Sequence, residues 1–438
     1  MERKYLKLRY TDLLGVLRTL TVKAPKELEG FRAYFDGSSV FGIASIEDGD
    51  LALEPVPETL AAVPWDPGSY SAISRIVTPE GERFVRDPRY VAERVEEYLA
   101  SMGLRAVMGA EVEFFIFKSV RVHVSPATQH LEIVSEESPW NGGIAPPAKT
   151  AYHVSEASDA VEPVRREIVE AVEAQGYTVT KEHHEVAAGG QVEITSGPYP
   201  PTRLGDFIQT LKLTAKKTAS LRGYTAVFLP KPLPSDNGSG MHIHISLWRG
   251  ERNLFGNGEL SDEARHFIAG LIEHGRSLSA IVSPTVNSYK RLVPGYEAPT
   301  ILAWGPRNRS VAIRVPPPNG YGMRIEYRPP DPSANPYFAL AALVMAGLDG
   351  VRKRLEPPEP ITANAYRISE EELRRDGIKA LPGTLAEALE CLDSDHEYLK
   401  PVFSEELLQL YIDIKRDEYR RVAYHPSPAE FSYYAALL

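Results

Sequence analysis

Two stretches of the chain combine side chains that could bind a divalent metal ion with side chains that could bind an anion. Segment 237–246 reads Asn-Gly-Ser-Gly-Met-His-Ile-His-Ile-Ser, so two histidines fall on one face of a predicted strand. Segment 287–299, Asn-Ser-Tyr-Lys-Arg-Leu-Val-Pro-Gly-Tyr-Glu-Ala-Pro, adds two cations and a carboxylate in a loop too rich in glycine and proline for ordinary core. Together these groups indicate an enzyme site for anionic substrates and a divalent metal.

Four predicted strands carry such side chains on one face each, because residues two apart in a strand point the same way. A half-exposed sheet explains this alternation in any single strand. Its recurrence in four strands, mostly with glutamate, histidine and arginine and with almost no lysine, serine or threonine, favours polar faces that line one cleft. The positions are Glu111 and Glu113; Gln191 and Glu193, with Glu185 across a turn; His242, His244 and Ser246; and Arg324, Glu326 and Arg328.

Five glutamates could not crowd into this cleft as free anions, because neighbouring like charges raise each other's pKa. We therefore expect cations to balance them. Carboxylate oxygens with one imidazole and no thiolate favour Mg²⁺ or Mn²⁺ over zinc, and six ligands suit two ions. A satisfied core histidine is the alternative for each of the two histidines. The candidate ligands are Glu111, Glu113, Glu185, Glu193, His242 and Glu326.

Arginines supply the opposite charge. Guanidinium groups bind carboxylate and phosphate through two hydrogen bonds, which suits a phosphorylated nucleotide and an acidic co-substrate. The chain has no Gly-x-x-x-x-Gly-Lys-Ser/Thr loop and no Gly-x-Gly-x-x-Gly after a strand. Metal and arginine would then have to hold any nucleotide phosphates. The candidates are Lys290, Arg291, Arg307, Arg309, Arg314, Arg324 and Arg328, among which interleaved turns favour Arg291, Arg309 and Arg328 over plain surface charge.

Composition excludes several other classes of protein. The 438 residues include 49 Lys and Arg against 59 Asp and Glu, a net charge of −10, which argues against nucleic acid or an anionic membrane as a partner. The single Cys391 cannot form an internal disulfide. The first residues lack the apolar region of a signal peptide, and no apolar run approaches a membrane span. We expect a cytoplasmic protein.

The order of predicted elements is mixed. Strands are expected over 5–10, 16–22 and 72–77, and a helix over 88–101 closes this block before Gly103. The region 118–150 predicts a hairpin followed by a mobile loop. Further helices are expected over 163–175, 204–221, 262–281, 336–355 and 405–422.

Eight short segments, in this order along essentially the whole chain, resemble the glutamine synthetase family. Any one of them could recur by chance, but eight collinear ones hardly could. They are Thr11-Asp-Leu-Leu-Gly15, Phe35-Asp-Gly-Ser-Ser39, Gly109-Ala-Glu-Val-Glu-Phe-Phe115, His183-His-Glu-Val-Ala187, Asn237-Gly-Ser-Gly-Met-His-Ile-His244, Asn287 to Pro299, Arg307-Asn-Arg-Ser310 and Arg324-Ile-Glu-Tyr-Arg328.

The resemblance implies an α+β fold: a small N-terminal β-grasp domain over 1–101 and a larger catalytic domain with a curved antiparallel sheet over 102–438. It implies a homo-oligomer, a dodecamer of two hexameric rings with sites at the subunit interfaces. The implied reaction is ATP-dependent formation of glutamine from glutamate and ammonium through γ-glutamyl phosphate.

The resemblance also assigns roles to single residues. The first metal would be bound by Glu113, Glu185 and Glu193, and the second by Glu111, His242 and Glu326. Glutamate would be held by Arg291, Arg328, Asn237 and Gly238, while Arg309, Arg314, Ser246 and Arg324 would face ATP and the transferring phosphoryl group. The ammonium site would comprise Asp36 from a neighbouring subunit, Ser39, Tyr152 and Glu297. Asp36 would accept a proton from ammonium, and Glu297 would close the site and keep out water.

Departures from the family pattern surround the acceptor pocket. Thr150-Ala-Tyr-His153 stands in place of Gly-Gly-Tyr-Phe, Pro329 follows the last arginine where an aromatic residue is usual, and Val192 stands where His or Asn is common. A ligase that joins glutamate to a polyamine or other organic amine is therefore an alternative. A non-catalytic relative and a guanidino kinase are more distant ones. Tyr366 roughly matches a tyrosine that some bacterial relatives adenylylate, although an unmodified surface tyrosine is the simpler interpretation.

Overall fold

The N-terminal domain is built on one mixed sheet. The computed structural model describes residues 4–138, 145–318, 320 and 322–430. Six strands pair in the order β2-β1-β6-β4-β3, with β5 added to β6, and only the β1–β6 pair is parallel. Leu6, Leu8, Leu53 and Ile76 alternate inward and are buried. The strands are β1 Tyr5–Thr11, β2 Leu17–Lys23, β3 Ala33–Asp36, β4 Asp50–Pro55, β5 Ala61–Ala62 and β6 Ser69–Val77.

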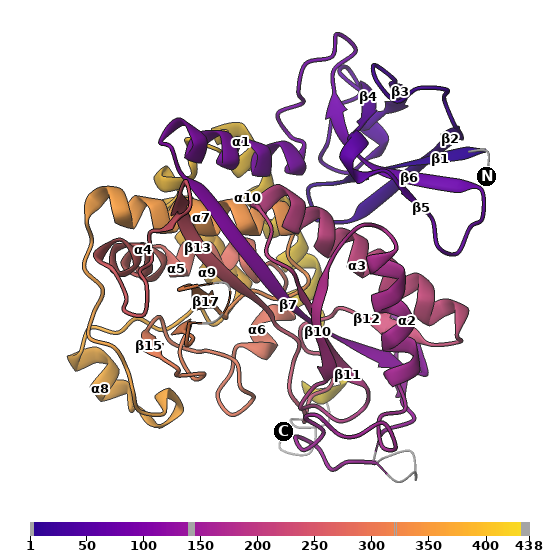
Figure 1. Ribbon diagram of the computed structural model, residues 1–438. Coiled ribbons are helices and arrows are strands. Elements are labelled where there is room, and N and C mark those ends of the chain that lie inside the picture. Colours follow the sequence, from indigo (N-terminus) through magenta and orange to yellow (C-terminus); the bar gives the residue numbers. More distant parts are fainter. Residues whose placement is uncertain (1–3, 139–144, 319, 321, 431–438) are drawn as a thin grey trace.

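A nine-stranded sheet organises the rest of the chain, and β7 and β13 cross its middle (Figure 1). The order is β10-β11-β7-β13-β17-β16-β15, with β12 on β7 and β14 on β13, and the pairs are antiparallel except β15 with β16. The strands are β7 Arg105–Phe117, β10 Val179–His184, β11 Gln191–Ser196, β12 Thr225–Val227, β13 Met241–Arg249, β14 Arg252–Asn253, β15 Trp304–Pro306, β16 Ile313–Val315 and β17 Ile325–Tyr327.

The two faces of this sheet differ in polarity. Ala110, Val112 and Phe114 of β7 are fully buried, and α1 and α3 pack against this strand. Ile243 and Ile245 of β13 are likewise fully buried. Because strand residues alternate, burying this set turns the intervening polar residues to the opposite face. Helices thus cover the apolar side of the sheet and leave the polar side available for a site.

The helices pack around α7, in which every residue from Pro336 to Gly350 is buried. Arg89 of α1 donates two hydrogen bonds of 3.0 Å to Asp206 of α3, which also accepts from the Tyr337 hydroxyl of α7 at 2.7 Å. This buried network ties three helices together. The helices are α1 Pro88–Ser101, α2 Glu162–Glu173, α3 Pro201–Leu221, α4 Asp262–Glu273, α5 Gly275–Val282, α6 Ser288–Arg291, α7 Pro336–Lys353, α8 Glu370–Arg375, α9 Leu385–Ser394 and α10 Glu405–Ala423.

Most predicted elements are confirmed, and the differences have local causes. The helix expected over 262–281 is two helices, because His274 adopts φ −91° and ψ 2° where hydrogen bonds from its ring reach Asp349 and Asp395. Helix α9 and strands β3 and β4 were not predicted. Helix α1, which was expected to close the N-terminal block, packs on α3 and α7. The domain boundary between 101 and 102 stays a prediction.

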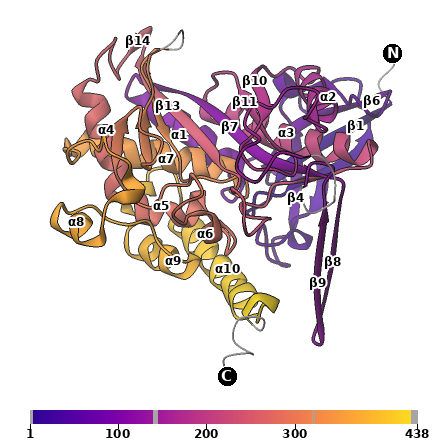
Figure 2. The same ribbon diagram turned by 90° about the horizontal axis from the view of Figure 1, so that it is seen from below.

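The hairpin expected after residue 118 is confirmed. Strands β8 Ser119–Ser125 and β9 Thr128–Val134 form an isolated two-stranded ribbon that projects from the body (Figure 2). The mobile loop expected beyond it includes 139–144, which lies outside the described residues. Within the described part of the chain, no helix is both long and apolar enough to cross a membrane.

Candidate active site

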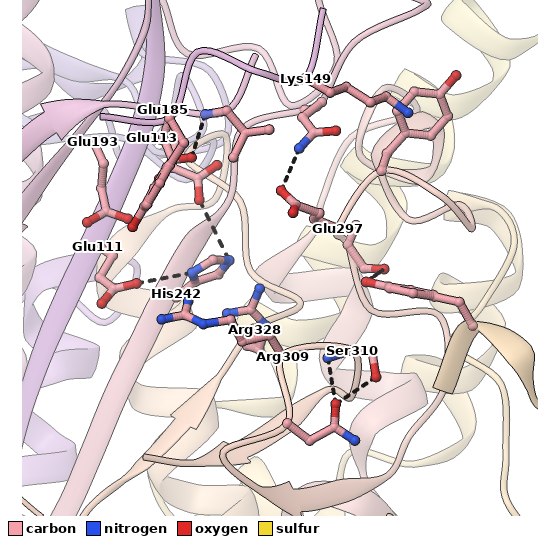
Figure 3. Close-up of a pocket in the computed structure, with 18 of the residues that line it drawn as sticks. Glu111, Glu113, Lys149, Glu185, Glu193, His242, Glu297, Arg309, Ser310 and Arg328 are labelled. Carbon is pink, nitrogen blue, oxygen red and sulfur yellow. Dashed lines mark hydrogen bonds and ion pairs between the residues drawn. The ribbon is translucent and has the colours of Figure 1, made fainter. Parts of the chain in front are cut away.

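Strand register brings the four predicted polar faces together. Glu193 of β11 is opposite Glu113 of β7, and His242 of β13 is opposite Glu111 of β7. Strand β17 pairs with the other edge of β13, and there His244 is opposite Glu326. Because these strands are neighbours, their functional side chains occupy one continuous area of the sheet. A cavity of about 980 Å³ opens over this area (Figure 3).

One metal-competent group consists of Glu111, His242 and Glu326, with one candidate ligand atom of each within 4.8 Å of the others. His242 Nδ1 lies 3.2 Å from Glu111 Oε2 and 3.7 Å from Glu326 Oε1. Burial opposes the charged form of Glu111, yet hydrogen bonds from His242 and His244 hold its pKa well below the ordinary value. These are the residues predicted for the second ion.

A second group consists of His183, Glu185 and Glu193, again within 4.8 Å. The sequence had placed Glu113 here instead of His183. Glu113 stands between the two groups, since its Oε1 lies 3.8 Å from His242 Nε2 while it faces Glu193 across the sheet. Sequence reasoning missed His183, although it is two residues from Glu185 in the quoted motif.

The acidic end fits divalent cations. Burial, followed by the carboxylates of Glu113 and Glu193, raises the pKa of Glu185 well above its ordinary value. This crowding is unfavourable for the protein alone and would be relieved by cations. Carboxylate oxygens with imidazole nitrogen form a donor set for Mg²⁺ or Mn²⁺. The structure therefore has candidate metal-binding clusters.

Arginines lie beside the acidic groups, but several of them already have partners. Glu326 is fully buried and pairs with both Arg314 and Arg328. Arg291 is also buried, and its guanidinium donates to the carbonyls of Arg328 at 3.1 Å and Pro329 at 2.7 Å. Arg291 thus fixes the segment after β17 while it lines the cavity. Arg309 is exposed and lines the same cavity beside Arg328 (Figure 3).

The loop that carries Glu297 covers part of the cavity. Glu297 has φ +60°, a left-handed conformation that is unusual for glutamate, and its Oε2 accepts a 2.7 Å hydrogen bond from Asn237 Nδ2. Lys149 donates to the Gly295 carbonyl at 2.9 Å, and its Nζ lies 4.0 Å from the Tyr296 ring centre. These contacts hold the Glu297 carboxylate over the cavity.

Glycine is required beside Asn237. A Cβ on Gly238 would lie 2.4 Å from the Pro230 carbonyl oxygen and 3.0 Å from Cγ of Arg291. Gly238 and Asn237 both line the cavity, as predicted for residues near the acidic substrate. Tyr152 and Tyr366 line it too, and the Tyr366 hydroxyl donates to the Ala298 carbonyl at 3.1 Å.

The predicted residues Asp36 and Ser39 lie elsewhere. Asp36 ends β3 in the N-terminal domain, is exposed, and accepts 2.6 Å hydrogen bonds from the hydroxyls of Ser38 and Ser39. Those hydroxyls lower the pKa of Asp36. Neither Asp36 nor Ser39 is among the residues that line this chain's cavity.

The residues predicted to face ATP do not all lie in the same place. Ser246 and Arg324 line a second cavity of about 240 Å³, which continues along the same sheet face beyond Glu111. Arg314 lies behind, against Glu326. The structure thus brings most predicted site residues around two adjoining cavities, while the individual roles stay predictions.

This arrangement defines a class of protein: an α+β enzyme whose sheet carries two acidic, metal-competent groups facing arginines that suit anionic substrates. Two family models cover nearly all of the chain, the glutamine synthetase β-grasp domain over residues 2–79 and the glutamine synthetase catalytic domain over residues 85–434. The chain belongs to the glutamine synthetase family.

Similar proteins agree over the full length. A glutamine synthetase of Sulfolobus acidocaldarius is 44% identical, with 98% of this chain and 95% of the relative covered. One from Aquifex aeolicus is 40% identical, with 98% and 96% covered. The cryo-EM structure of Plasmodium falciparum glutamine synthetase aligns with a TM-score of 0.88 at 25% identity, covering 99% of this chain and 96% of that chain. A structure titled GmaS/ADP complex aligns with a TM-score of 0.83 at 29% identity, covering 98% of this chain and 96% of that chain.

Proposed function

We propose that the protein is an ATP-dependent carbon–nitrogen ligase that forms glutamine from glutamate and ammonium through γ-glutamyl phosphate. The observation that carries this proposal is the register of β11, β7, β13 and β17, which gathers the acidic groups beside Arg328 in a cavity that Arg309 also lines. Family membership adds that this site belongs to a ligase.

The first step transfers a phosphoryl group. The γ-carboxylate of glutamate attacks the γ-phosphorus of ATP, the bond to the bridging oxygen breaks, and ADP leaves. Arg309, an exposed residue of the cavity lining, would offset charge on the transferring group with its guanidinium. Arg328 and the Asn237–Gly238 segment hold glutamate. The metal ions, Mg²⁺ or Mn²⁺, supply charge neutralisation at the phosphates when bound by Glu111, Glu113, Glu185, Glu193, His242 and Glu326.

The second step forms the amide. Ammonium gives a proton to Asp36, and the resulting ammonia attacks the acyl carbon so that phosphate leaves. Tyr152 and Ser39 complete the ammonium site. Glu297, held over the cavity by Asn237, excludes water that would otherwise hydrolyse the acyl phosphate.

Because Asp36 is outside its own chain's cavity, we propose that a neighbouring copy supplies it and that the protein is a homo-oligomer, a dodecamer of two hexameric rings. Large apolar side chains near Asp36 support an interface: Tyr34 is 66% exposed, Phe41 55% and Ile46 87%. Analytical ultracentrifugation gives the number of copies. An active monomer would rule out a shared site.

The reaction is tested with purified protein, Mg²⁺ and ATP by measuring phosphate release and product mass together. Glutamate plus ammonium should give phosphate and glutamine in equal amounts, with negligible turnover when glutamate is omitted. The organic-amine alternative is tested in parallel with ethylamine and putrescine. Turnover with an organic amine and none with ammonium would replace the proposed acceptor.

A further inference from the structure

Lys181 occupies the junction between the two cavities. It lies on β10, opposite Thr195 of β11, and its Nζ is 2.9 Å from Glu193 Oε1. Among the described residues, only Lys181 and Glu111 line both the large cavity and the second one. The sequence analysis had not included Lys181 among the candidate residues.

The second cavity suits the part of a nucleotide that carries no charge. Uncharged residues line much of it, among them Val107, Met108 and Pro198, while the Ser246 hydroxyl donates to the Val107 carbonyl at 3.3 Å. A ligand whose phosphates lie at the acidic groups with their metal ions can therefore extend its remaining part over Glu111 into this space. Any such ligand must pass Lys181.

The ion pair with Glu193 does not by itself account for a lysine here. The Lys181 side chain is 47% exposed, and an ion pair with this much exposure contributes about 0–1 kcal/mol to stability. Glu193 also has other donors, because the Thr195 hydroxyl lies 2.9 Å and His183 Nε2 3.2 Å from its Oε1. Burial disfavours the charged form of Lys181, but Glu193 and Glu111 outweigh it and raise its pKa, so the ammonium is charged.

We propose that Lys181 is a nucleotide-binding residue that contacts the phosphate chain of ATP. With a divalent ion bound at Glu193, the ammonium would be repelled from this carboxylate. The flexible four-carbon stem then lets the ammonium turn toward phosphate oxygens at the mouth of the second cavity. The inference rests on the proposed function for the identity of the nucleotide, and it adds a residue that selects for its phosphates.

The test compares Lys181→Met and Lys181→Arg with wild type in the full-length oligomer. Calorimetry with ADP and Mg²⁺ should show about tenfold weaker binding for Lys181→Met, a change of ~1.4 kcal/mol. Lys181→Arg should restore most of the affinity. In turnover assays the KM for ATP should rise by a similar factor, while the KM for glutamate stays within twofold.

A matched control is Lys118→Met. Lys118 has the same chemistry, with its side chain 44% exposed and its Nζ 3.1 Å from Glu136 Oε1, but it lines neither cavity. It should bind ADP as wild type does. Mn²⁺ binding without nucleotide adds a second readout: Lys181→Met should bind Mn²⁺ at least as tightly as wild type, because the competing ammonium is gone.

Two results would overturn the inference: unchanged ADP affinity in Lys181→Met, or equal weakening of Mn²⁺ and ADP binding, which indicates a purely structural role. Failure of the proposed function is distinguishable from both. A wild-type protein that binds ADP but makes no glutamine would refute the reaction, and the comparison of ADP affinities would still decide the role of Lys181.

Discussion

Glu297 offers a sharp perturbation, because its carboxylate and its backbone make separable contributions. The side chain accepts one hydrogen bond from Asn237 at 2.7 Å, and the backbone φ of +60° disfavours any residue with a Cβ. Three substitutions separate the terms. Glu297→Gln keeps the length and an acceptor for Asn237, Glu297→Ala removes the side chain and keeps the strain, and Glu297→Gly removes both.

The expected magnitudes follow from these contacts. A hydrogen bond to a charged group contributes about 1.5–3 kcal/mol, so Glu297→Ala should lower the free energy of unfolding by about this amount. Glycine avoids the left-handed penalty of roughly 1–2 kcal/mol, so Glu297→Gly should be more stable than Glu297→Ala by about 1 kcal/mol. Denaturant unfolding of the three variants measures both differences.

The catalytic expectation is uncoupling. Without the carboxylate over the cavity, water reaches the acyl phosphate, so phosphate release should persist while glutamine formation falls at least tenfold. A tenfold change in this partition corresponds to ~1.4 kcal/mol between the two competing barriers. Phosphate and glutamine are measured in the same reaction. A parallel loss of both products, or an alanine variant as stable as the glycine variant, would refute the reasoning.

Three further predictions rest on other contacts. Arg291→Ala should raise the KM for glutamate and leave the affinity for ATP unchanged, as steady-state titration can measure. It should also lower the melting temperature in a thermal melt, because buried carbonyls lose their donor. An unchanged KM for glutamate would contradict the role of Arg291 in binding glutamate. Burial opposes the charged form of His274, but its two aspartate partners outweigh this effect and raise its pKa above 6.5. Its contribution to stability is therefore complete below pH 6.5 and lost as pH rises through the raised value, so unfolding free energy should fall over that window in wild type and not in His274→Gln. Asp206→Ala removes two hydrogen bonds of the buried Arg89 guanidinium and leaves Glu93 as its acidic partner, so it should cost about 1.5–3 kcal/mol in denaturant unfolding, with kcat per folded molecule unchanged. A cost below about 1 kcal/mol would contradict a stabilising role of this network.

The sequence predicted best what periodicity controls. Helix α1 begins and ends as predicted, since Asp87 caps it and Pro88 fits its first position. The polar faces were also readable, because a period of two fixes which residues share a side. The break between α4 and α5 at His274 could not be predicted, since its cause lies in Asp349 and Asp395, which are distant in the sequence.

The contacts within the site that could not be predicted depend on how the strands pair. Nothing local indicates that Glu193 is opposite Glu113, or that Arg291 uses its guanidinium on backbone carbonyls. His183 escaped notice for a related reason: its ring joins Glu193 only through the register of β10 with β11. The contribution of Asp36 to a neighbouring copy's site came only from the family resemblance and stays a prediction, since the structure of a single chain does not test it.

The charges around the cavity constrain the order of events. Five glutamates and six lysine or arginine side chains line it, so the total is nearly balanced, yet Glu111, Glu113 and Glu193 lie together on the neighbouring strands β7 and β11 (Figure 3). A polyphosphate that approaches the acidic end is repelled until cations bind there, since uncompensated like charges at this range oppose binding. Glu326, buried between Arg314 and Arg328, keeps those two guanidiniums from neutralising the other carboxylates. The crowding of these carboxylates therefore makes bound divalent cations a precondition for binding a polyphosphate.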